Sequence, residues 1–183
     1  LHFEPGTEGR YSNTNYFLLG HILEILTGKP LSVAMSDVFM RFGLNHIHMN
    51  GHIADACGYV KHNDEMFSCG RLAMESGDSS VVSSLTDLGL WCNAILNADI
   101  LSANSWKECL NFTPKPYGCG LWQFDNGWFG HDGGLPGLRH WQRLNFKDKA
   151  AIIVLSNTVM EAPPFLAQMM EYFIKTKQTA ERL

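Results

Sequence analysis

The sequence predicts an α/β fold of the α+β kind, in which helices pack on an antiparallel sheet and a helical insert precedes that sheet. Apolar residues recur at helical spacing through the first two thirds of the chain, and alternating strands follow in the last third. The 183 residues, 45% of them hydrophobic, suffice for one domain with a sizeable core. We therefore expect one domain over 1–183, mainly helical over 1–116, with strands and a C-terminal helix over 117–183.

The first helix follows a turn that is rich in glycine and proline. Ser12 and Asn13 are good N-cap residues, because their side-chain oxygens accept unpaired N–H groups, and Gly28 is a helix terminator. The helix should therefore begin at about Asn13 and end at Gly28. Apolar residues at helical spacing predict its buried face: Leu18, Leu19, Ile22, Leu23, Ile25 and Leu26.

Further helices are predicted over about 30–42 and 84–97, with a short one after Ser102 and a last one from Pro163. In the last third, residues 117–124 alternate as one aromatic-rich strand, residues 125–127 form a turn, and a return strand starts at Trp128. Residues 138–146 and 150–155 predict a second hairpin. The continuous apolar run of 150–155 predicts a buried central strand.

Charge and composition limit the possible partners. The net charge is -4, from 14 basic and 18 acidic residues, and no basic stripe suggests nucleic acid or anionic lipid. We expect a small-molecule or peptide substrate and no cofactor, and the oligomeric state stays open. The chain opens on Leu1 rather than methionine and runs at once into a turn, so we expect the C-terminal portion of a longer protein.

The five cysteines are odd in number and widely spaced, and none forms a C-x-x-C pair. A disulfide framework is not expected, which favours a reducing compartment. Cys92, on a predicted helix, and Cys119, in a predicted strand, are expected to be small buried hydrophobes.

Four histidines at positions 46, 48, 52 and 62, near Asp55 and Cys57, raise the hypothesis of a metal site. Their spacing matches no defined zinc pattern, and Gly51 places them in a loop. We therefore expect no metal.

Two stretches suggest chemistry. Tyr11 precedes a helix N-terminus, whose partial positive charge favours a phenolate; the alternative is a half-buried core tyrosine whose hydroxyl finds a partner. Residues 130–137 place His131 beside Gly133 and Gly134, which let a ligand approach the backbone closely; the alternative is a glycine-rich hairpin with a chance histidine.

The order of residues in both stretches resembles the serine β-lactamase and penicillin-binding protein superfamily, closest to its class C-like branch. Residues 5–29 read Pro-Gly-Thr, then Tyr-Ser-Asn-Thr-Asn-Tyr, then Leu-Leu-Gly and a helix ending in Thr-Gly-Lys. His131-x-Gly133, followed by Gly-Leu-Pro-Gly, is similar to the third motif of the D,D-peptidase, D-aminopeptidase and esterase relatives. The resemblance implies the C-terminal portion of a β-lactamase or transpeptidase-like fold, hence a partial domain.

The resemblance also implies roles for individual residues. Tyr11 would act as or with the general base, and Asn13 would hold the substrate amide or the serine-lysine pair. His131 would face the leaving group or a substrate carboxylate. Gly134, beside Gly133, would offer its N–H to an oxyanion. The first motif of the superfamily, Ser-x-x-Lys, is absent, because no serine of this chain has a lysine three residues on.

We therefore expect a serine hydrolase that forms an acyl-enzyme on a peptide, β-lactam or ester carbonyl, with its nucleophile outside this chain, which alone would be inactive. The alternatives are a non-catalytic relative that binds a peptidoglycan-type ligand or a partner protein, and a metal-dependent hydrolase built on the histidines. The resemblance implies the cell envelope or periplasm, whereas the five cysteines leave the cytoplasm open.

Overall fold

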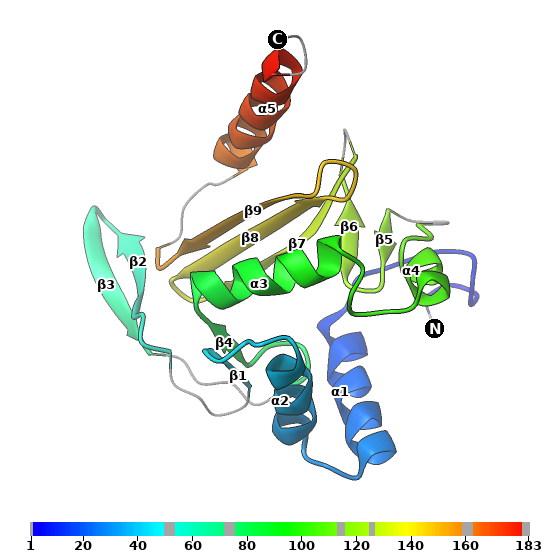
Figure 1. Ribbon diagram of the computed structural model, residues 1–183. Coiled ribbons are helices and arrows are strands. Elements are labelled where there is room, and N and C mark those ends of the chain that lie inside the picture. Colours follow the sequence, from blue (N-terminus) through cyan, green and yellow to red (C-terminus); the bar gives the residue numbers. More distant parts are fainter. Residues whose placement is uncertain are drawn as a thin grey trace.

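The computed structural model describes residues 2–49, 54–71, 76–112, 116–124, 127–158 and 163–180. Its helices are α1 (Asn13–Thr27), α2 (Leu31–Arg41), α3 (Leu85–Leu96), α4 (Ala103–Cys109) and α5 (Pro163–Ala180). Its main sheet contains β5 (Tyr117–Gly118), β6 (Leu121–Gln123), β7 (Trp128–Leu135), β8 (Leu138–Asn145) and β9 (Ala150–Ser156). All neighbours in this sheet are antiparallel and follow sequence order, so the expected fold class is confirmed (Figure 1).

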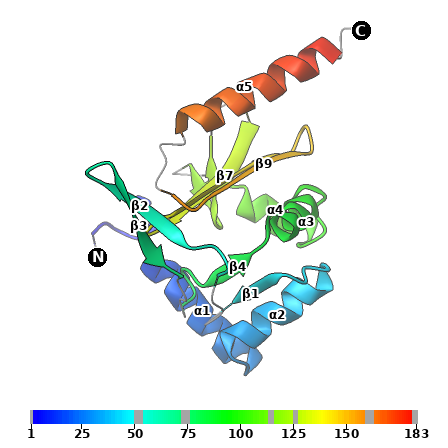
Figure 2. The same cartoon turned by 90° about the vertical axis from the view of Figure 1, so that its left-hand side faces the viewer.

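Helices cover both faces of the sheet, α5 on one side and α3 on the other (Figure 2). Successive strand residues point to opposite faces. Trp141 of β8 therefore joins a buried cluster with Leu166 of α5, whereas Leu144 of the same strand joins one with Cys92 of α3. The core thus has two layers, separated by the sheet.

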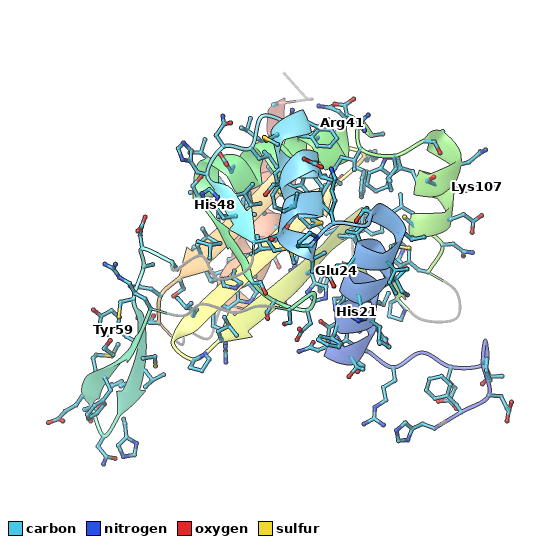
Figure 3. The ribbon with its side chains drawn as sticks, turned by 90° about the horizontal axis from the view of Figure 1, so that it is seen from below. His21, Glu24, Arg41, His48, Tyr59 and Lys107 are labelled. Carbon is cyan, nitrogen blue, oxygen red and sulfur yellow. The ribbon has the colours of Figure 1, made fainter. Side chains whose placement is uncertain are left out.

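A second helical layer lies on the α3 side of the sheet and includes α1 and α2. Its core contains Leu31 and Phe39 of α2 and Ile47 of β1 (Ile47–Met49), which pairs with β4 (Val81–Ser83). Pro30, the N-cap of α2, makes no side-chain cap, and Glu24 of α1 accepts the Leu31 N–H at 2.9 Å instead. Figure 3 shows Glu24 and His21 on the same helix, where His21 Nδ1 lies 3.0 Å from the Glu24 carboxylate.

The ends of α1 agree with the sequence, but its buried face does not. Ser12 accepts the Thr14 N–H at 3.3 Å, and Gly28 ends the helix with a left-handed φ of 64°. The predicted apolar face is wrong, because five of its six residues are exposed, Leu26 to 78%: Leu18, Leu19, Ile22, Ile25 and Leu26. Helical spacing shows which residues share a face, but not what covers that face.

Three strand predictions also need correction. Residues 117–124 are not one strand, because Cys119 and Gly120, with φ values of 46° and 90°, form a turn between β5 and β6. Cys119 is therefore exposed, although the buried position of Cys92 is confirmed. Within the described residues β9 is an edge strand, not a central one, and Leu155 is 42% exposed.

The hairpin of β2 (Gly58–His62) and β3 (Glu65–Gly70) was not expected from the sequence. It projects from the end of the main sheet, as the position of Tyr59 in Figure 3 shows. Its base is held there, because the Tyr59 N–H donates to the carbonyl oxygens of Gly137 (3.3 Å) and Asn157 (2.9 Å).

Among the described helices, none is by itself long and apolar enough to cross a membrane; α1 and α2, bent by 83° at the break between them, reach that length and composition only together.

Candidate active site

Five aromatic side chains from the start of α1 and from β5, β6 and β7 meet on one side of the sheet. We call them the aromatic cluster: Tyr11, Tyr16, Tyr117, Trp122 and His131. The Tyr11 ring centroid lies 5.5 Å from that of His131 and 5.6 Å from that of Tyr117. The structure therefore brings together Tyr11 and His131, the titratable residues of the two stretches that suggested chemistry.

Local structure explains how each ring reaches the cluster. Tyr11 directly precedes the N-cap of α1, and Tyr16 lies in the first turns of that helix. Tyr117 of β5 and Trp122 of β6 are cross-strand partners, with ring centroids 4.5 Å apart. His131 lies within β7, opposite Gln142 of β8.

A chain of hydrogen bonds runs through the cluster and defines the tautomer of His131. Its Nδ1 lies 2.7 Å from the Asp132 carbonyl oxygen, and because a carbonyl only accepts, Nδ1 carries the hydrogen. In the neutral ring Nε2 then accepts from the Tyr117 hydroxyl at 3.2 Å. The Tyr117 oxygen in turn accepts from the Tyr16 hydroxyl.

Asp132 follows His131 in the chain, but its side chain forms an ion pair with Arg143. Its carboxylate accepts from Arg143 Nη1 at 2.5 Å, and the buried guanidinium of Arg143 lies 3.9 Å above the Phe124 ring. Asp132 and His131 are consecutive strand residues and point to opposite faces of the sheet. This ion pair therefore stabilises β7 from behind the aromatic cluster.

Two tyrosines of the cluster, Tyr11 and Tyr117, have a raised pKa. Burial is the main cause that raises the pKa of Tyr11, with further contributions from Tyr16 and Asp78. Burial and the hydrogen bond to Tyr16 raise the pKa of Tyr117. The expected phenolate at the helix N-terminus is thus opposed by stronger effects. Tyr11 is 41% exposed, so its ring is partly buried.

A cavity of about 580 Å³ adjoins the cluster at His131. It lies between strands β7 to β9 and β4, and its wall includes Gly133, His140, Gln142, Ser83 and Leu155. His131 thus contributes both to the cavity wall and to the hydrogen-bonded tyrosines.

His140 adds a second imidazole to this wall. It lies opposite Gly133 on the neighbouring strand, and a Cβ at position 133 would lie 2.7 Å from its ring. Burial and the charge of Arg139 lower the pKa of His140, so the neutral ring is favoured. The cavity therefore presents two imidazoles on one face of the sheet.

A model of the beta-lactamase family, defined from its known members, matches residues 1–170 of the sequence. The chain belongs to the beta-lactamase family.

Solved structures support this assignment at the level of the fold. A penicillin-binding protein from Bacillus halodurans superposes with a TM-score of 0.79 at 19% identity, over 93% of this chain and 58% of that one. An octameric penicillin-binding protein homologue from Pyrococcus abyssi superposes with a TM-score of 0.81 at 21% identity, over 95% of this chain and 44% of that one. A D-stereospecific amidohydrolase from Streptomyces sp. superposes with a TM-score of 0.72 at 22% identity, over 85% of this chain and 52% of that one. The chain thus spans about half the length of these members of the beta-lactamase fold.

Asn13 and Gly134, to which the beta-lactamase resemblance also assigns roles, are not members of the aromatic cluster. Asn13 is exposed at the first position of α1, two residues after Tyr11. Gly134 lies opposite Arg139, and a Cβ at Gly134 would lie 2.1 Å from the guanidinium. A side chain at Gly133 would meet the His140 ring, whereas one at Gly134 would meet only the end of the flexible Arg139 side chain, which can move aside.

Sequence reasoning missed Tyr16, Tyr117 and His140. Tyr16 closes the same Tyr-Ser-Asn-Thr-Asn-Tyr string that begins at Tyr11, which could have marked it. Tyr117 and His140 carry no local signal, because only the strand register places them beside His131 and Gly133.

The histidine hypothesis for a metal site gains no support from the residues that the structure describes. These contain no group of three or more histidine, cysteine or acidic side chains that could hold a metal ion. His52 lies outside the described residues.

Proposed function

We propose that this chain supplies the tyrosine and histidine side of the active site of a serine hydrolase, which acts through an acyl-enzyme on a peptide, β-lactam or ester carbonyl. The observation that carries the proposal is the meeting of Tyr11 and His131, from the start of α1 and the middle of β7, beside a cavity. The attacking serine would come from a segment outside residues 1–183. A D-stereospecific amidohydrolase of the same fold supports amide cleavage as the reaction class.

The proposed acylation uses Tyr11 as proton carrier. The serine oxygen adds to the carbonyl carbon while its proton passes to the Tyr11 oxygen. The Gly134 N–H, beside Gly133, stabilises the oxyanion, and Asn13 holds the substrate amide by hydrogen bonds. The intermediate then expels the amine or alcohol, which takes the proton back from Tyr11. Water finally hydrolyses the acyl ester.

This role requires a cation beside Tyr11, because its pKa is raised in this chain. A lysine ammonium about 4 Å from the phenol oxygen would favour the phenolate by about 4 kcal/mol at an effective dielectric constant of about 20, or about three pK units. The lysine of a Ser-x-x-Lys motif, one helical turn from the serine, would supply this charge. Nucleophile and base would thus be activated by the same missing segment.

Tyr117 would hold the His131 ring in one orientation. Its hydroxyl occupies Nε2 of His131, while Nδ1 is bound to the Asp132 carbonyl. The ring edge of His131 at the cavity would then face the leaving group or a substrate carboxylate.

The test is Tyr11→Phe in the complete protein that contains this chain, with Tyr172→Phe as matched control, since Tyr172 is 72% exposed on α5. If Tyr11 is the general base, acylation by a fluorescent penicillin or an activated ester falls about a hundred- to ten-thousandfold with unchanged thermal midpoint. Near wild-type acylation with a lowered midpoint would make Tyr11 structural, because a lost hydrogen bond costs about 0.5–1.5 kcal/mol of stability.

The second candidate is a non-catalytic relative that binds a peptidoglycan-type ligand or a partner protein. One observation favours it: the pKa of the Tyr11 phenol is raised in this chain, so the phenol holds its proton. Mass spectrometry of the complete protein after incubation with the penicillin probe separates the candidates. A stoichiometric serine adduct supports the hydrolase, whereas saturable binding without any adduct supports the binding protein.

A further inference from the structure

Cys109 and Cys119 are ten positions apart, but their side chains lie near enough for Cys119 to contribute to the raised pKa of Cys109. Cys109 is the last residue of α4, and Cys119 lies in the turn between β5 and β6. The backbones also touch, because a Cβ on Gly118 would lie 2.6 Å from the Cys109 carbonyl oxygen. The turn is therefore packed directly against the end of the helix.

Cys119 occupies a backbone position that disfavours a cysteine. With φ values of 46° at Cys119 and 90° at Gly120, this two-residue connection has the form of a type I′ turn, which favours Asn, Asp or Gly. A non-glycine residue other than these in the left-handed region is uncommon and strained. The local backbone therefore offers no reason for a thiol at this place, whereas the neighbouring Cys109 does.

The two thiols differ in their exposure to solvent. Cys119 is exposed and Cys109 is partly buried. Burial, followed by the contact with Cys119 and the charge of Glu108, raises the pKa of Cys109. Cys92, by contrast, is 1% exposed, and burial raises its pKa to about 11. Cys119 is thus the thiol that meets a reagent first, and Cys109 is placed to react second.

We propose that Cys109 and Cys119 are a redox modification site, which a small-molecule disulfide such as oxidised glutathione converts reversibly into an intramolecular disulfide. The Cys119 thiolate attacks one sulfur of the reagent, forms a mixed disulfide and releases one glutathione thiolate. The Cys109 thiolate then attacks the Cys119 sulfur and releases the second. Two protein thiols are oxidised, one glutathione disulfide is reduced to two thiols, and the two protons pass to glutathione.

This disulfide would act on the aromatic cluster through a short connection. It would join the end of α4 to a turn that begins two residues after Tyr117, whose hydroxyl contacts both Tyr16 and His131. The redox state would then set how firmly Tyr117 is held. Only this consequence rests on the proposed function; the disulfide itself does not.

The experiment treats the full chain with oxidised glutathione, blocks remaining thiols with an alkylating reagent, and maps the peptides by mass spectrometry without reduction. We expect one linked peptide pair that contains Cys109 and Cys119, lost again with dithiothreitol. Alkylation of both cysteines in oxidised protein, or a link between Cys57 and Cys69 in their place, would overturn the proposal.

Cys119→Asn is the decisive variant, because asparagine suits the turn and the protein should fold at least as well. It should abolish the linked peptide, and Cys69→Ser, the matched control, should retain it. In the wild type, oxidation should raise the thermal midpoint by several degrees, and in Cys119→Asn it should not. An equal shift in both would contradict the assignment. No turnover enters these measurements, so they stand apart from any failure of the hydrolase proposal.

Discussion

Tyr117 shows how one residue can depend on three segments at once. Its hydroxyl accepts from Tyr16 of α1 and donates to His131 of β7, and its ring packs on Trp122 of β6. Each of these contacts crosses between elements, so the position of the His131 ring is linked to the start of α1. At the residue scale, the arrangement of the site therefore depends on a tyrosine that no motif had marked.

We expect Tyr117→Phe to change the hydrogen bonding of His131 at Nε2. The substitution removes the donor to Nε2, so the Nδ1–H form keeps only its bond to the Asp132 carbonyl oxygen, and the nitrogen shift of Nε2 moves toward that of an unbonded acceptor. Long-range nitrogen-proton NMR of the imidazoles measures this change directly. Tyr59→Phe, on β2, serves as the control and should leave the His131 signals unchanged. Unaltered His131 nitrogen shifts in Tyr117→Phe would refute the hydrogen-bonded chain.

His140 should make the protein less stable in mild acid. Its pKa is lowered in the folded state, by burial first and then by Arg139, so the unfolded chain binds the proton more readily. The free energy of unfolding should therefore fall as the pH decreases below about 6.5, the ordinary pKa of histidine. Urea titrations between about pH 7.5 and about pH 5 measure this slope. His140→Gln should flatten it, and His62→Gln, at an exposed position, should not.

At the scale of elements, the position of α1 depends on a contact between two glycines. A Cβ on Gly20 would lie 3.1 Å from the Gly77 α-carbon, and a Cβ on Gly77 would lie 2.4 Å from the Tyr16 carbonyl oxygen. The loop at Gly77 therefore packs directly on the α1 backbone. This close approach places Tyr16, and with it the start of the helix, beside the sheet.

Gly77→Ala should push α1 away from this loop. We expect a loss of about 1–3 kcal/mol in stability, because the new methyl meets backbone that cannot rotate away, and weaker packing of Tyr16 on Tyr117. Denaturant unfolding and tyrosine NMR measure the two effects. Gly89→Ala in α3, where nothing lies within 4 Å, is the matched control and should stabilise by about 0.5–1 kcal/mol. Equal behaviour of both variants would disprove the contact.

At the scale of the whole molecule, the described residues leave two apolar surfaces uncovered. One is the face of α1 that carries Ile25 and Leu26, exposed to 74% and 78%. The other is the free edge of β9, where Leu155 lies. Exposed apolar faces and unpaired strand edges both favour association.

Residues 1–183 expressed alone should therefore associate as concentration rises. Sedimentation velocity over a concentration series measures this, and Ile25→Lys with Leu26→Lys should shift the protein toward monomer. Met66→Lys is the control, since Met66 is 52% exposed on the separate β2–β3 hairpin. A sharp monomer boundary at every concentration would show that these surfaces do not drive association.

The sequence by itself determined the features that neighbouring residues encode. Ser12 and Gly28 mark the ends of α1 because capping involves only the adjacent turn, and the alternation of residues 138–155 marks β8 and β9. The two recurrent strings, around Tyr11 and His131, likewise indicated the family that the comparison shows. The roles of Tyr11, Asn13 and His131 remain predictions.

Only the tertiary structure decided what lies against what. The exposure of Leu26, the edge position of β9 and the contact of Tyr117 with His131 all depend on packing between separate elements. Spacing assigns a side chain to a face of its own element, but burial and pairing depend on the element packed against that face. For this reason Tyr11 and His131 were found by sequence, and the tyrosine that joins them was not.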